Sequence, residues 1–352
     1  MKKIILFCHG IGNGGAERVL LTIANSLSNR DYAVSVATTN PPHNDYTLDK
    51  KVNRFFCIPK IEIPVIRVLS RIIIIRKLIK SERPNVIISF SANINVQVLL
   101  ATLFLKPKKI VSERTDPKQY PSSSFGRFIR NKVYHLADSI VFQTEDAKKY
   151  FSNKIQEKGT VICNPLCIEV KENCYSKQKR MIGVGSLGEQ KNWNIAIQAF
   201  RKFYSNHPDY YFDIYGEGPQ KEDLLTLINQ LSLTNVVNLK GFTEKIVEEM
   251  MSSSIYISSS LYEGISNAML EALSLGIPAV CTDCPVGGAR MFIDNGANGY
   301  LVPVNDINAM ADAMEKIVDD KTIAEEALIY AERIRHKLSL EKVTDQWESI
   351  IK

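Results

Sequence analysis

The chain has 352 residues, of which 45% are hydrophobic and 23% charged. This composition is that of an ordinary globular protein, which excludes a disordered or fibrous chain, and the length predicts two domains of roughly 150 residues each. The net charge of +6 is unevenly divided, because residues 1–176 contain 27 Lys and Arg against 14 Asp and Glu, whereas the remainder contains 17 against 24. We therefore expect the two halves to face different partners, with no nucleic acid among them.

The apolar stretches and the cysteines bear on location. The longest apolar run, 72–75, lies between Arg71 and Arg76 and is far shorter than the ~20 residues of a membrane-spanning helix. The seven cysteines are scattered, and neither Cys281/Cys284 nor the pair at 163 and 167 has the further ligands that a metal site needs. We expect free thiols in a reducing, cytoplasmic compartment, with a zinc or redox site as the alternative.

The first half of the chain alternates short apolar runs with amphipathic runs, which predicts strands alternating with helices. The expected strands are 2–9, 33–39, 85–91, 109–115 and 139–144. The expected helices are 18–27, 66–80, 95–104, 125–136 and 145–151. Such alternation is typical of a parallel sheet covered on both faces.

A turn-rich segment then interrupts the pattern, and a second alternating series follows it. The expected strands are 181–187, 211–216, 236–242, 255–260 and 278–282. The expected helices are 192–204, 220–231, 244–251, 268–275 and further helices to the end.

These two series predict two α/β, doubly wound, Rossmann-like domains that face each other across a cleft. The domains are 1–166 and 181–335, joined by a linker at 167–180. A last helix, 336–352, is expected to pack back toward the first domain.

The first loop contains a G-x-G-x-x-G pattern at Gly10, Gly12 and Gly15, between a strand and a helix. A dinucleotide-binding domain also needs an acidic residue after the second strand, but that strand ends in Thr and Asn at 38–40. The pattern instead favours a phosphate held by backbone N–H groups at a helix N-terminus, although a purely structural tight turn remains an alternative.

Two glutamates flank the turn in SLYEGISNAMLEAL, with Glu263 in the loop after a strand and Glu271 one turn into the next helix. Carboxylates accept hydrogen bonds from the paired hydroxyls of sugars and ribose. The first N–H groups of that helix, near Asn267 and Ala268, can hold a phosphate. The segment is therefore a candidate site for a ligand with vicinal hydroxyls and a phosphate, although an ordinary exposed helix residue and a loop charge are the alternative.

Several further segments occur along the chain in the order in which a known family has them. They are GGAERVL at 14–20, SERTDP at 112–117, VFQTE at 141–145, VGSLGEQKN at 184–192, YGEGP at 215–219, LKGF at 239–242 and CTDCPVGGARMFI at 281–293. With the two glutamates, they resemble family 4 of the retaining glycosyltransferases, which have the GT-B fold and include bacterial capsule, O-antigen and exopolysaccharide enzymes. The resemblance covers nearly the whole chain, and it implies that the domain at 1–166 binds the acceptor and the domain at 181–335 binds the nucleotide sugar.

The resemblance implies roles for matching residues. Lys191 is similar to the lysine that neutralises the diphosphate leaving group, Glu263 to the carboxylate at the donor sugar, and Arg114 occupies a catalytic position. Glu271 is similar to the glutamate that binds the ribose. The other implied substrate-binding residues are Gly14, Gly15, Ser186, Gly216, Lys240, Gly241, Phe242, Gly264, Ile265, Ser266, Asn267 and Ala268.

Three positions depart from the family pattern. Ser186 replaces an arginine that partners the lysine in many members, so Lys191 is expected to carry that charge alone. Arg114 stands where many members have a histidine, which leaves its chemistry open. Ser266 replaces a frequent proline, a change expected to affect loop stiffness more than chemistry.

The predicted function is hexosyl or N-acetylhexosaminyl transfer from a nucleoside diphosphate sugar, UDP-linked, to a saccharide acceptor on a lipid carrier, with retention. No D-x-D triplet occurs in the sequence, so no metal ion or other cofactor is expected. The basic segments 67–80 and 127–132 are expected to meet an anionic membrane surface, which predicts a peripheral protein on the inner face of the cell membrane. For 67–80, the alternative is a core helix whose long cationic side chains extend to solvent. The alternatives are a GT-B sugar-nucleotide epimerase and a non-catalytic sugar-nucleotide-binding module.

Overall fold

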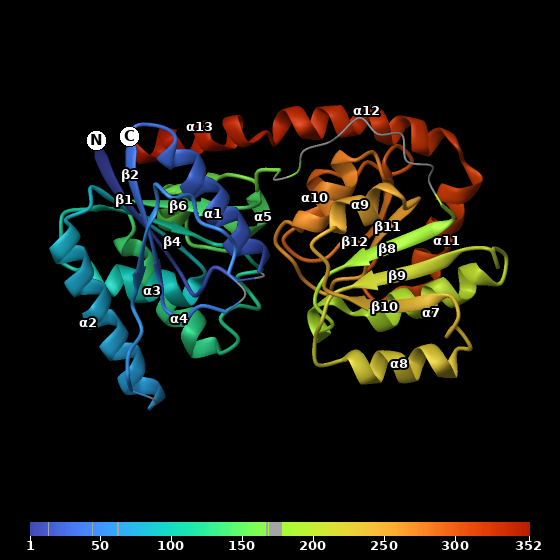
Figure 1. The fold of residues 1–352 in the computed structure, drawn as a ribbon, viewed down its shortest axis with the longest axis horizontal. Coiled ribbons are helices and arrows are strands. Elements are labelled where there is room, and N and C mark those ends of the chain that lie inside the picture. Colours follow the sequence, from blue (N-terminus) through green and yellow to red (C-terminus); the bar gives the residue numbers. More distant parts are fainter. Residues whose placement is uncertain (13, 44, 62, 167, 169–177) are drawn as a thin grey trace. The chain divides into compact units, whose positions relative to one another are not determined.

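The computed structural model describes residues 1–12, 14–43, 45–61, 63–166, 168 and 178–352 (Figure 1). The chain forms two compact units. The N-terminal unit comprises residues 1–167 and 338–352, and the C-terminal unit comprises 168–337. Most of the expected linker, 167–180, lies outside the described residues.

The N-terminal unit is built on a sheet of seven parallel strands in the order β3-β2-β1-β4-β5-β6-β7. The strands are β1 (Lys2–Cys8), β2 (Tyr32–Thr38), β3 (Asn53–Phe56), β4 (Val86–Phe90), β5 (Lys108–Ser112), β6 (Ser139–Phe142) and β7 (Gly159–Val161). The order reverses between β1 and β4, where the chain crosses from one side of the sheet to the other.

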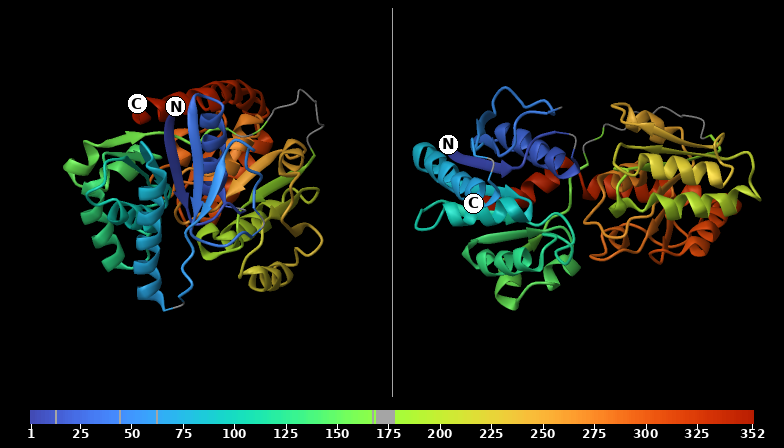
Figure 2. Two further views of the ribbon diagram at one scale, coloured as in Figure 1. Left: turned by 60° about the vertical axis from the view of Figure 1, so that its left-hand side comes forward. Right: turned by 90° about the horizontal axis from the view of Figure 1, so that it is seen from below.

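Helices cover both faces of this sheet (Figures 1 and 2). The helices are α1 (Gly15–Ser28), α2 (Pro64–Glu82), α3 (Ala92–Ala101), α4 (Ser124–Val133), α5 (Glu145–Lys149), α6 (Asn153–Gln156) and α13 (Leu340–Ile351), with a 3-10 turn η1 (Tyr134–Leu136). One core lies under α1 and α13 and includes Leu20 and Trp347, and the other lies under α2 and α3 and includes Ile75 and Val98.

The last helix, α13, packs on α1 within the N-terminal unit. The Ser26 hydroxyl lies 2.8 Å from that of Thr344, and Arg30 forms an ion pair with Asp345 at 2.6 Å. Trp347 has no exposed surface. The end of the chain is therefore part of the core formed by its beginning.

The C-terminal unit has a sheet of six parallel strands in the order β10-β9-β8-β11-β12-β13. The strands are β8 (Arg180–Val184), β9 (Tyr211–Tyr215), β10 (Val237–Gly241), β11 (Ile255–Ser258), β12 (Ala279–Thr282) and β13 (Gly299–Val302). The helices are α7 (Trp193–Tyr204), α8 (Lys221–Gln230), α9 (Ile246–Met251), α10 (Asn267–Ser274), α11 (Ile307–Asp319) and α12 (Thr322–Lys337), with short turns η2 (Glu189–Lys191) and η3 (Ala289–Met291).

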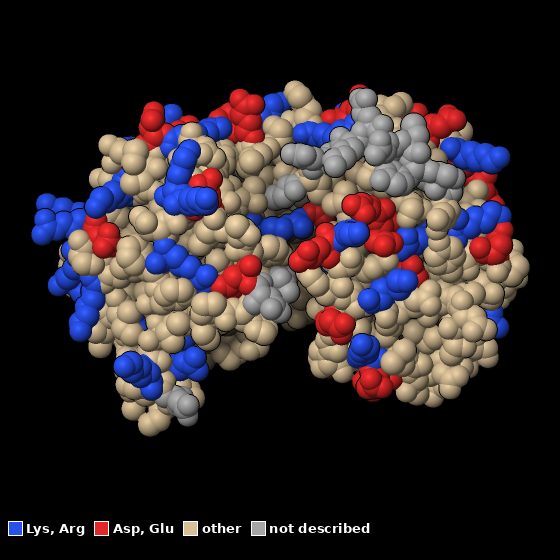
Figure 3. All heavy atoms as spheres, viewed as in Figure 1, with Lys and Arg blue, Asp and Glu red and all other residues tan. Residues whose placement is uncertain are grey.

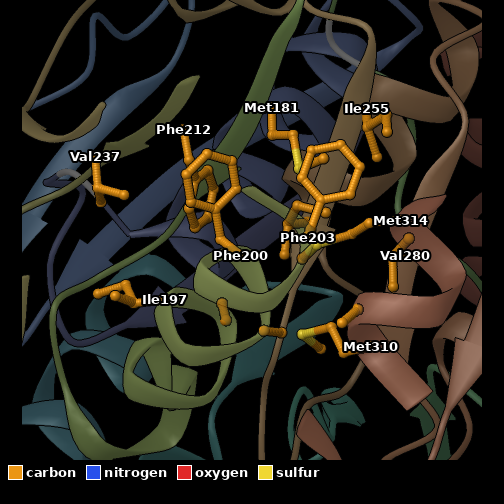
Figure 4. Close-up of a cluster of buried hydrophobic side chains, with 14 of the residues drawn as sticks. Met181, Ile197, Phe200, Phe203, Phe212, Val237, Ile255, Val280, Met310 and Met314 are labelled. Atoms are coloured by element: carbon orange, nitrogen blue, oxygen red, sulfur yellow. The ribbon is translucent and has the colours of Figure 1, made fainter. Parts of the chain in front are cut away.

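The main core of the C-terminal unit lies between the sheet and α7, α8 and α11. Figure 4 shows Phe200 of α7 beside Phe212 of β9, Phe203 of α7 near Met181, and Met310 and Met314 of α11 on the side of Val280. The rings of Phe200 and Phe212 are 5.6 Å apart between centroids. The prediction of two doubly wound parallel sheets is therefore confirmed, and the structure adds three short strands that the pattern did not indicate, β3, β7 and β13.

Among the described residues, no helix is both long and apolar enough to cross a membrane.

Candidate functional site

Two loops of the C-terminal unit begin at the point where the strand order of its sheet reverses. β8 and β11 are neighbours there, although α7, β9, α8, β10 and α9 separate them in the chain. Ligands of doubly wound sheets bind beyond the carboxyl ends of strands at such a reversal. Lys191 lies in the loop after β8, in the turn η2, and Glu263 lies in the loop after β11.

The structure brings these two predicted residues into direct contact. Lys191 Nζ donates to Glu263 Oε2 at 2.6 Å, and the Ser260 hydroxyl donates to the same oxygen at 3.0 Å. The side chains of Lys191 and Glu263 are 13% and 20% exposed. Because this partial burial limits screening by water, the pair interacts more strongly than a surface ion pair, yet it stays within reach of a ligand.

A glycine makes room for the lysine. A Cβ atom at Gly185 would lie 2.7 Å from Lys191 Cε, so the stem of the lysine passes directly over the backbone of Gly185. At the base of the loop, Gly185 N donates to the carbonyl of Tyr215 at 2.9 Å.

Hydrogen bonds join the two loops and fix their relative position. The Ser259 hydroxyl donates to the carbonyl of Lys191 at 2.8 Å, and Leu261 N donates to the carbonyl of Gln190 at 2.8 Å. The Gln190 amide in turn donates to the carbonyl of Tyr262 at 2.9 Å. Ser259 and Ser260 were not among the predicted residues, and the only signal for them in the sequence is the Ser run at 258–260.

The loop after β11 leads into α10, whose first turn supplies the expected anion-binding N–H groups. Ser266 caps the helix, since its hydroxyl accepts from Met269 N at 3.4 Å. Gly264 and Ile265 are buried, and a Cβ at Gly288 would lie only 1.8 Å from the Gly264 carbonyl oxygen. This close approach holds the segment in place beneath the first turn.

Asn267 and Ala268 open α10 and are partly exposed, so their N–H groups stand at the positive end of the helix dipole. Glu271 lies one turn further along and is only 3% exposed. Because the Glu271 side chain is already buried, it has little conformational entropy left to lose when a hydroxyl binds its carboxylate, and in this sense the carboxylate is preorganised.

A second set of predicted residues lies at the ends of β9 and β10. Gly216 N donates to the Gly241 carbonyl at 2.9 Å, and a Cβ at Gly216, whose φ is +148°, would lie 1.9 Å from the Gly185 carbonyl oxygen. Lys240 and Phe242 are both exposed, Phe242 by 59%.

Ser186 is also exposed, and its carbonyl accepts from the buried Trp193 indole at 3.1 Å. Gly216 thus brings the loop of Ser186 against the end of β9.

Cys281 lies in β12 and Cys284 in the loop that follows it, and both thiols are free and buried. Burial raises the pKa of Cys284 to about 11, and it raises the pKa of Cys281 further still. Both thiols are therefore protonated at neutral pH. Within the described ranges, no three His, Cys, Asp or Glu side chains form a group that could hold a metal ion.

In the N-terminal unit, the predicted glycines stand at the start of α1. Gly14 is the N-cap of this helix, Gly14 N donates to the Gly12 carbonyl at 2.7 Å, and Gly15 is its first residue. A Cβ at Gly14 would lie 2.0 Å from Glu17 Oε2, so the glutamate covers this backbone. Burial raises the pKa of Glu17.

Arg114 follows β5 in the N-terminal unit and is enclosed by aromatic rings. Its guanidinium carbon lies 4.1 Å from the Phe90 ring centroid and 5.6 Å from that of Trp347, and the arginine donates to Asn164 Oδ1 at 2.9 Å. Burial lowers the pKa of Arg114. These contacts account for the position of the side chain, and its catalytic role stays a prediction.

A buried carboxyl beside Arg114 was not among the predicted residues. Glu113 is 1% exposed, and its Oε2 accepts from the Tyr134 hydroxyl at 2.8 Å and lies 3.9 Å from Arg130 NH1. Burial raises the pKa of Glu113 to about 7, although Arg130 and the bond from Tyr134 act in the opposite direction.

Comparison with known proteins gives two family matches that adjoin each other. Residues 13–169 match the family described as Glycosyltransferase Family 4, and residues 168–335 match the family described as Glycosyl transferases group 1. Among curated proteins, the chain is 26% identical over its whole length to the whole of an uncharacterized glycosyltransferase of Haemophilus influenzae.

The chain is also similar to a characterised transferase of Campylobacter jejuni, with 27% identity over 91% of both chains. That protein is an N-acetylgalactosamine-N,N'-diacetylbacillosaminyl-diphospho-undecaprenol 4-alpha-N-acetylgalactosaminyltransferase. The amylovoran biosynthesis glycosyltransferase AmsD of Erwinia amylovora is 27% identical over 84% of this chain and 85% of its own.

Two solved structures have the same fold at low sequence identity. A variant of S. aureus TarM in complex with fondaparinux, alpha-GlcNAc-glycerol and UDP has a TM-score of 0.82 at 14% identity, with both chains fully covered. Anabaena HepE in complex with UDP has a TM-score of 0.81 at 17% identity, with 99% of each chain covered.

Proposed function

This chain belongs to the glycosyltransferases of GT-B fold, which transfer a sugar from a nucleotide sugar, and from that premise we propose that its donor is a UDP-sugar and its acceptor a lipid-linked saccharide. The observation that carries the proposal is the contact between Lys191 and Glu263 at the strand-order reversal of the C-terminal sheet. A cation for the diphosphate and a carboxylate for the sugar hydroxyls stand there beside the N-terminus of α10.

In this proposal, four features of the C-terminal unit bind the donor. The first N–H groups of α10 and the ammonium of Lys191 face the diphosphate, and Glu271 accepts from the ribose hydroxyls. Gly216 and residues 240–242, at the ends of β9 and β10, frame the base in this proposal. UDP is the nucleotide in the structures of TarM and HepE, which supports a uridine-linked donor.

In the proposed reaction, the bond between the anomeric carbon and the diphosphate oxygen breaks while Lys191 stabilises the negative charge of the leaving group. The acceptor hydroxyl attacks the same face of the sugar, which gives retention, and its proton passes to an oxygen of the leaving phosphate. Glu263 binds donor-sugar hydroxyls during this step. The sequence lacks the D-x-D handle for a metal, and the proposed reaction uses no metal ion.

The proposed acceptor is a saccharide on a lipid carrier, and the proposed donor sugar is a hexose or an N-acetylhexosamine. The name of the C. jejuni relative includes an undecaprenol-linked saccharide, which supports a lipid-linked acceptor, and the name of AmsD includes amylovoran biosynthesis, which supports a role in polysaccharide synthesis. We place the protein in the cytoplasm, peripheral to the inner face of the membrane. The family matches do not favour the alternative of an epimerase.

A screen of nucleotide sugars by thermal denaturation tests the donor. A ligand at 100 times its dissociation constant stabilises the folded protein by about 2.7 kcal/mol, so the true donor stands out from its analogues. Mass spectrometry of an incubation of that donor with undecaprenyl-diphosphate saccharides then identifies the product. Release of an epimerised sugar, with no glycosylated acceptor, would contradict the proposal.

A further inference from the structure

Helix α2 of the N-terminal unit presents large aliphatic side chains to solvent. One side of the helix is buried through Arg71, Ile75 and Ile79, which follow one another at intervals of four residues. The opposite side carries Val65, Ile66, Leu69 and Ile73, which are 71%, 45%, 56% and 54% exposed. Aliphatic residues gathered along one exposed side of a helix indicate an interaction surface.

The same side of α2 continues into exposed lysines. Lys77 and Lys80 follow Leu69 and Ile73 along the helix, and both are exposed. Glu82, the last residue of α2, is the only acidic residue of the helix. Figure 3 shows Lys and Arg side chains along the outer edge of the N-terminal unit where α2 lies.

The turn that follows α3 extends this surface. Phe104 in this turn is 98% exposed, and Lys106 beside it is also exposed. Arg76 of α2 donates from NH1 to the carbonyls of Ala101 and Leu103, both at 2.8 Å, and these hydrogen bonds hold the turn against α2. We define the α2 surface as Val65, Ile66, Leu69, Ile73, Lys77, Lys80, Phe104 and Lys106.

Other cations of the basic segments have structural roles instead. Arg71 is 8% exposed and contacts Gln97, and Arg76 is occupied by the turn carbonyls. In the segment 127–132, Arg127 donates to the carbonyl of Pro121 at 2.9 Å, and Arg130 is fully buried. Arg71, Arg76, Arg127 and Arg130 therefore have partners within the protein, whereas Lys77 and Lys80 of the segment 67–80 are exposed.

We propose that the α2 surface docks the protein on an anionic lipid bilayer. Its aliphatic and aromatic side chains enter the boundary between headgroups and acyl chains, while Lys77, Lys80 and Lys106 extend to the lipid phosphates. The pairing of apolar residues with cations on one surface suits a bilayer, which offers hydrocarbon and negative charge together. This inference rests on the proposed function, because a lipid-linked acceptor is held at such a bilayer.

Vesicle flotation of the full chain tests the proposal. We expect binding to vesicles of phosphatidylcholine with phosphatidylglycerol and at least tenfold weaker binding to phosphatidylcholine alone. Lys77→Gln, Lys80→Gln and Lys106→Gln together should weaken binding to the anionic vesicles by about a hundredfold, at about fivefold for each lysine. Leu69→Gln with Ile73→Gln should weaken it at least about tenfold.

Matched controls separate this surface from general effects. Leu328→Gln with Ile329→Gln changes two residues of α12 that are 54% and 49% exposed, close to the values of Leu69 and Ile73. Lys149→Gln with Lys154→Gln removes exposed charge elsewhere on the N-terminal unit. Both control variants should float as the unaltered protein does, and equal losses in the controls and in the α2 variants would overturn the proposal.

Two further measurements keep the outcomes distinct. If Leu69→Gln with Ile73→Gln lowers the mass measured by light scattering and leaves vesicle binding unchanged, the α2 surface is an interface between copies, and the proposal fails. Calorimetric binding of UDP and transfer to a water-soluble acceptor should be unchanged in all α2 variants. If the unaltered protein neither binds UDP nor transfers a sugar but still binds vesicles, the proposed function is refuted and the proposed docking surface is not.

Discussion

Lys191 and Glu263 are 72 residues apart in the chain, yet the lysine ammonium lies 2.6 Å from a carboxylate oxygen of the glutamate. The contact neutralises a cation that the proposed reaction needs for the diphosphate. Binding of the donor must therefore exchange partners, with the phosphates taking the ammonium and the sugar hydroxyls taking the carboxylate. This exchange governs the first two predictions.

Lys191→Ala should lower turnover by at least about a hundredfold, because Ser186 provides no second cation in the same loop. Lys191→Arg should recover part of the loss, and Lys202→Ala, at an exposed lysine of α7, should have no effect. Steady-state kinetics with the identified donor provide the measurement. Near-normal turnover of Lys191→Ala would mean that another cation carries the diphosphate.

Glu271→Ala should weaken binding of bare UDP by roughly tenfold to a hundredfold, since it removes a charge-assisted hydrogen bond worth about 1.5 to 3 kcal/mol. Glu263→Ala should leave UDP affinity equal or higher, because it frees Lys191, while it lowers turnover and sugar discrimination. Isothermal titration calorimetry distinguishes the two. Equal losses of UDP affinity in both variants would refute this division of roles.

Gly185→Ala should lower turnover by about tenfold to a hundredfold through displacement of Lys191, because the new Cβ would lie 2.7 Å from the lysine Cε. Its melting temperature should change little, since the atom that must move belongs to a flexible side chain. Gly188→Ala in the same loop is the control, with its nearest neighbour, Ser186 Oγ, at 3.8 Å. Equal activity of the two variants would argue against this account of Gly185.

Transfer should continue after treatment with EDTA, because the proposed reaction stabilises the leaving group with Lys191 and helix N–H groups. The assay compares initial rates before and after the chelator, and again after magnesium is added. Loss of activity that magnesium restores would overturn the metal-free reaction.

Glu113 should make the protein less stable as the pH rises from about 4.5 to about 7. Its pKa is raised in the folded state, so the folded protein binds more protons than the unfolded one across this window, and deprotonation favours unfolding. Glu113→Gln should remove this dependence, and at pH 8 it should be more stable than the unaltered protein by on the order of 1 to 3 kcal/mol.

Urea unfolding at pH 5 and pH 8 provides this test, and the informative quantity is the difference between the two proteins at each pH. A difference that does not change between pH 5 and pH 8 would mean that Glu113 is ionised across the whole window.

The sequence by itself determined the fold class and most of the strands and helices, because the spacing of apolar residues that marks a buried strand or an amphipathic helix is a local property of consecutive residues. The strands β3, β7 and β13 were missed because they are too short to show such a spacing. They have only four, three and four residues, and each lies at the edge of its sheet, where one neighbouring strand suffices and little periodicity is required. Glu263 and Glu271 could be predicted as site residues from the sequence, because both lie in one short segment.

Only the tertiary structure decided which of these residues meet. Lys191 reaches Glu263 because β8 and β11 lie side by side, and Ser260 shares the contact because it follows β11. The same holds for the cations of α2 and α4, where Arg71, Arg76 and Arg130 look like surface charges in the sequence. In the structure Arg71 and Arg130 are buried, and Arg76 donates to carbonyls of the turn after α3, contacts that no periodicity along the helices encodes.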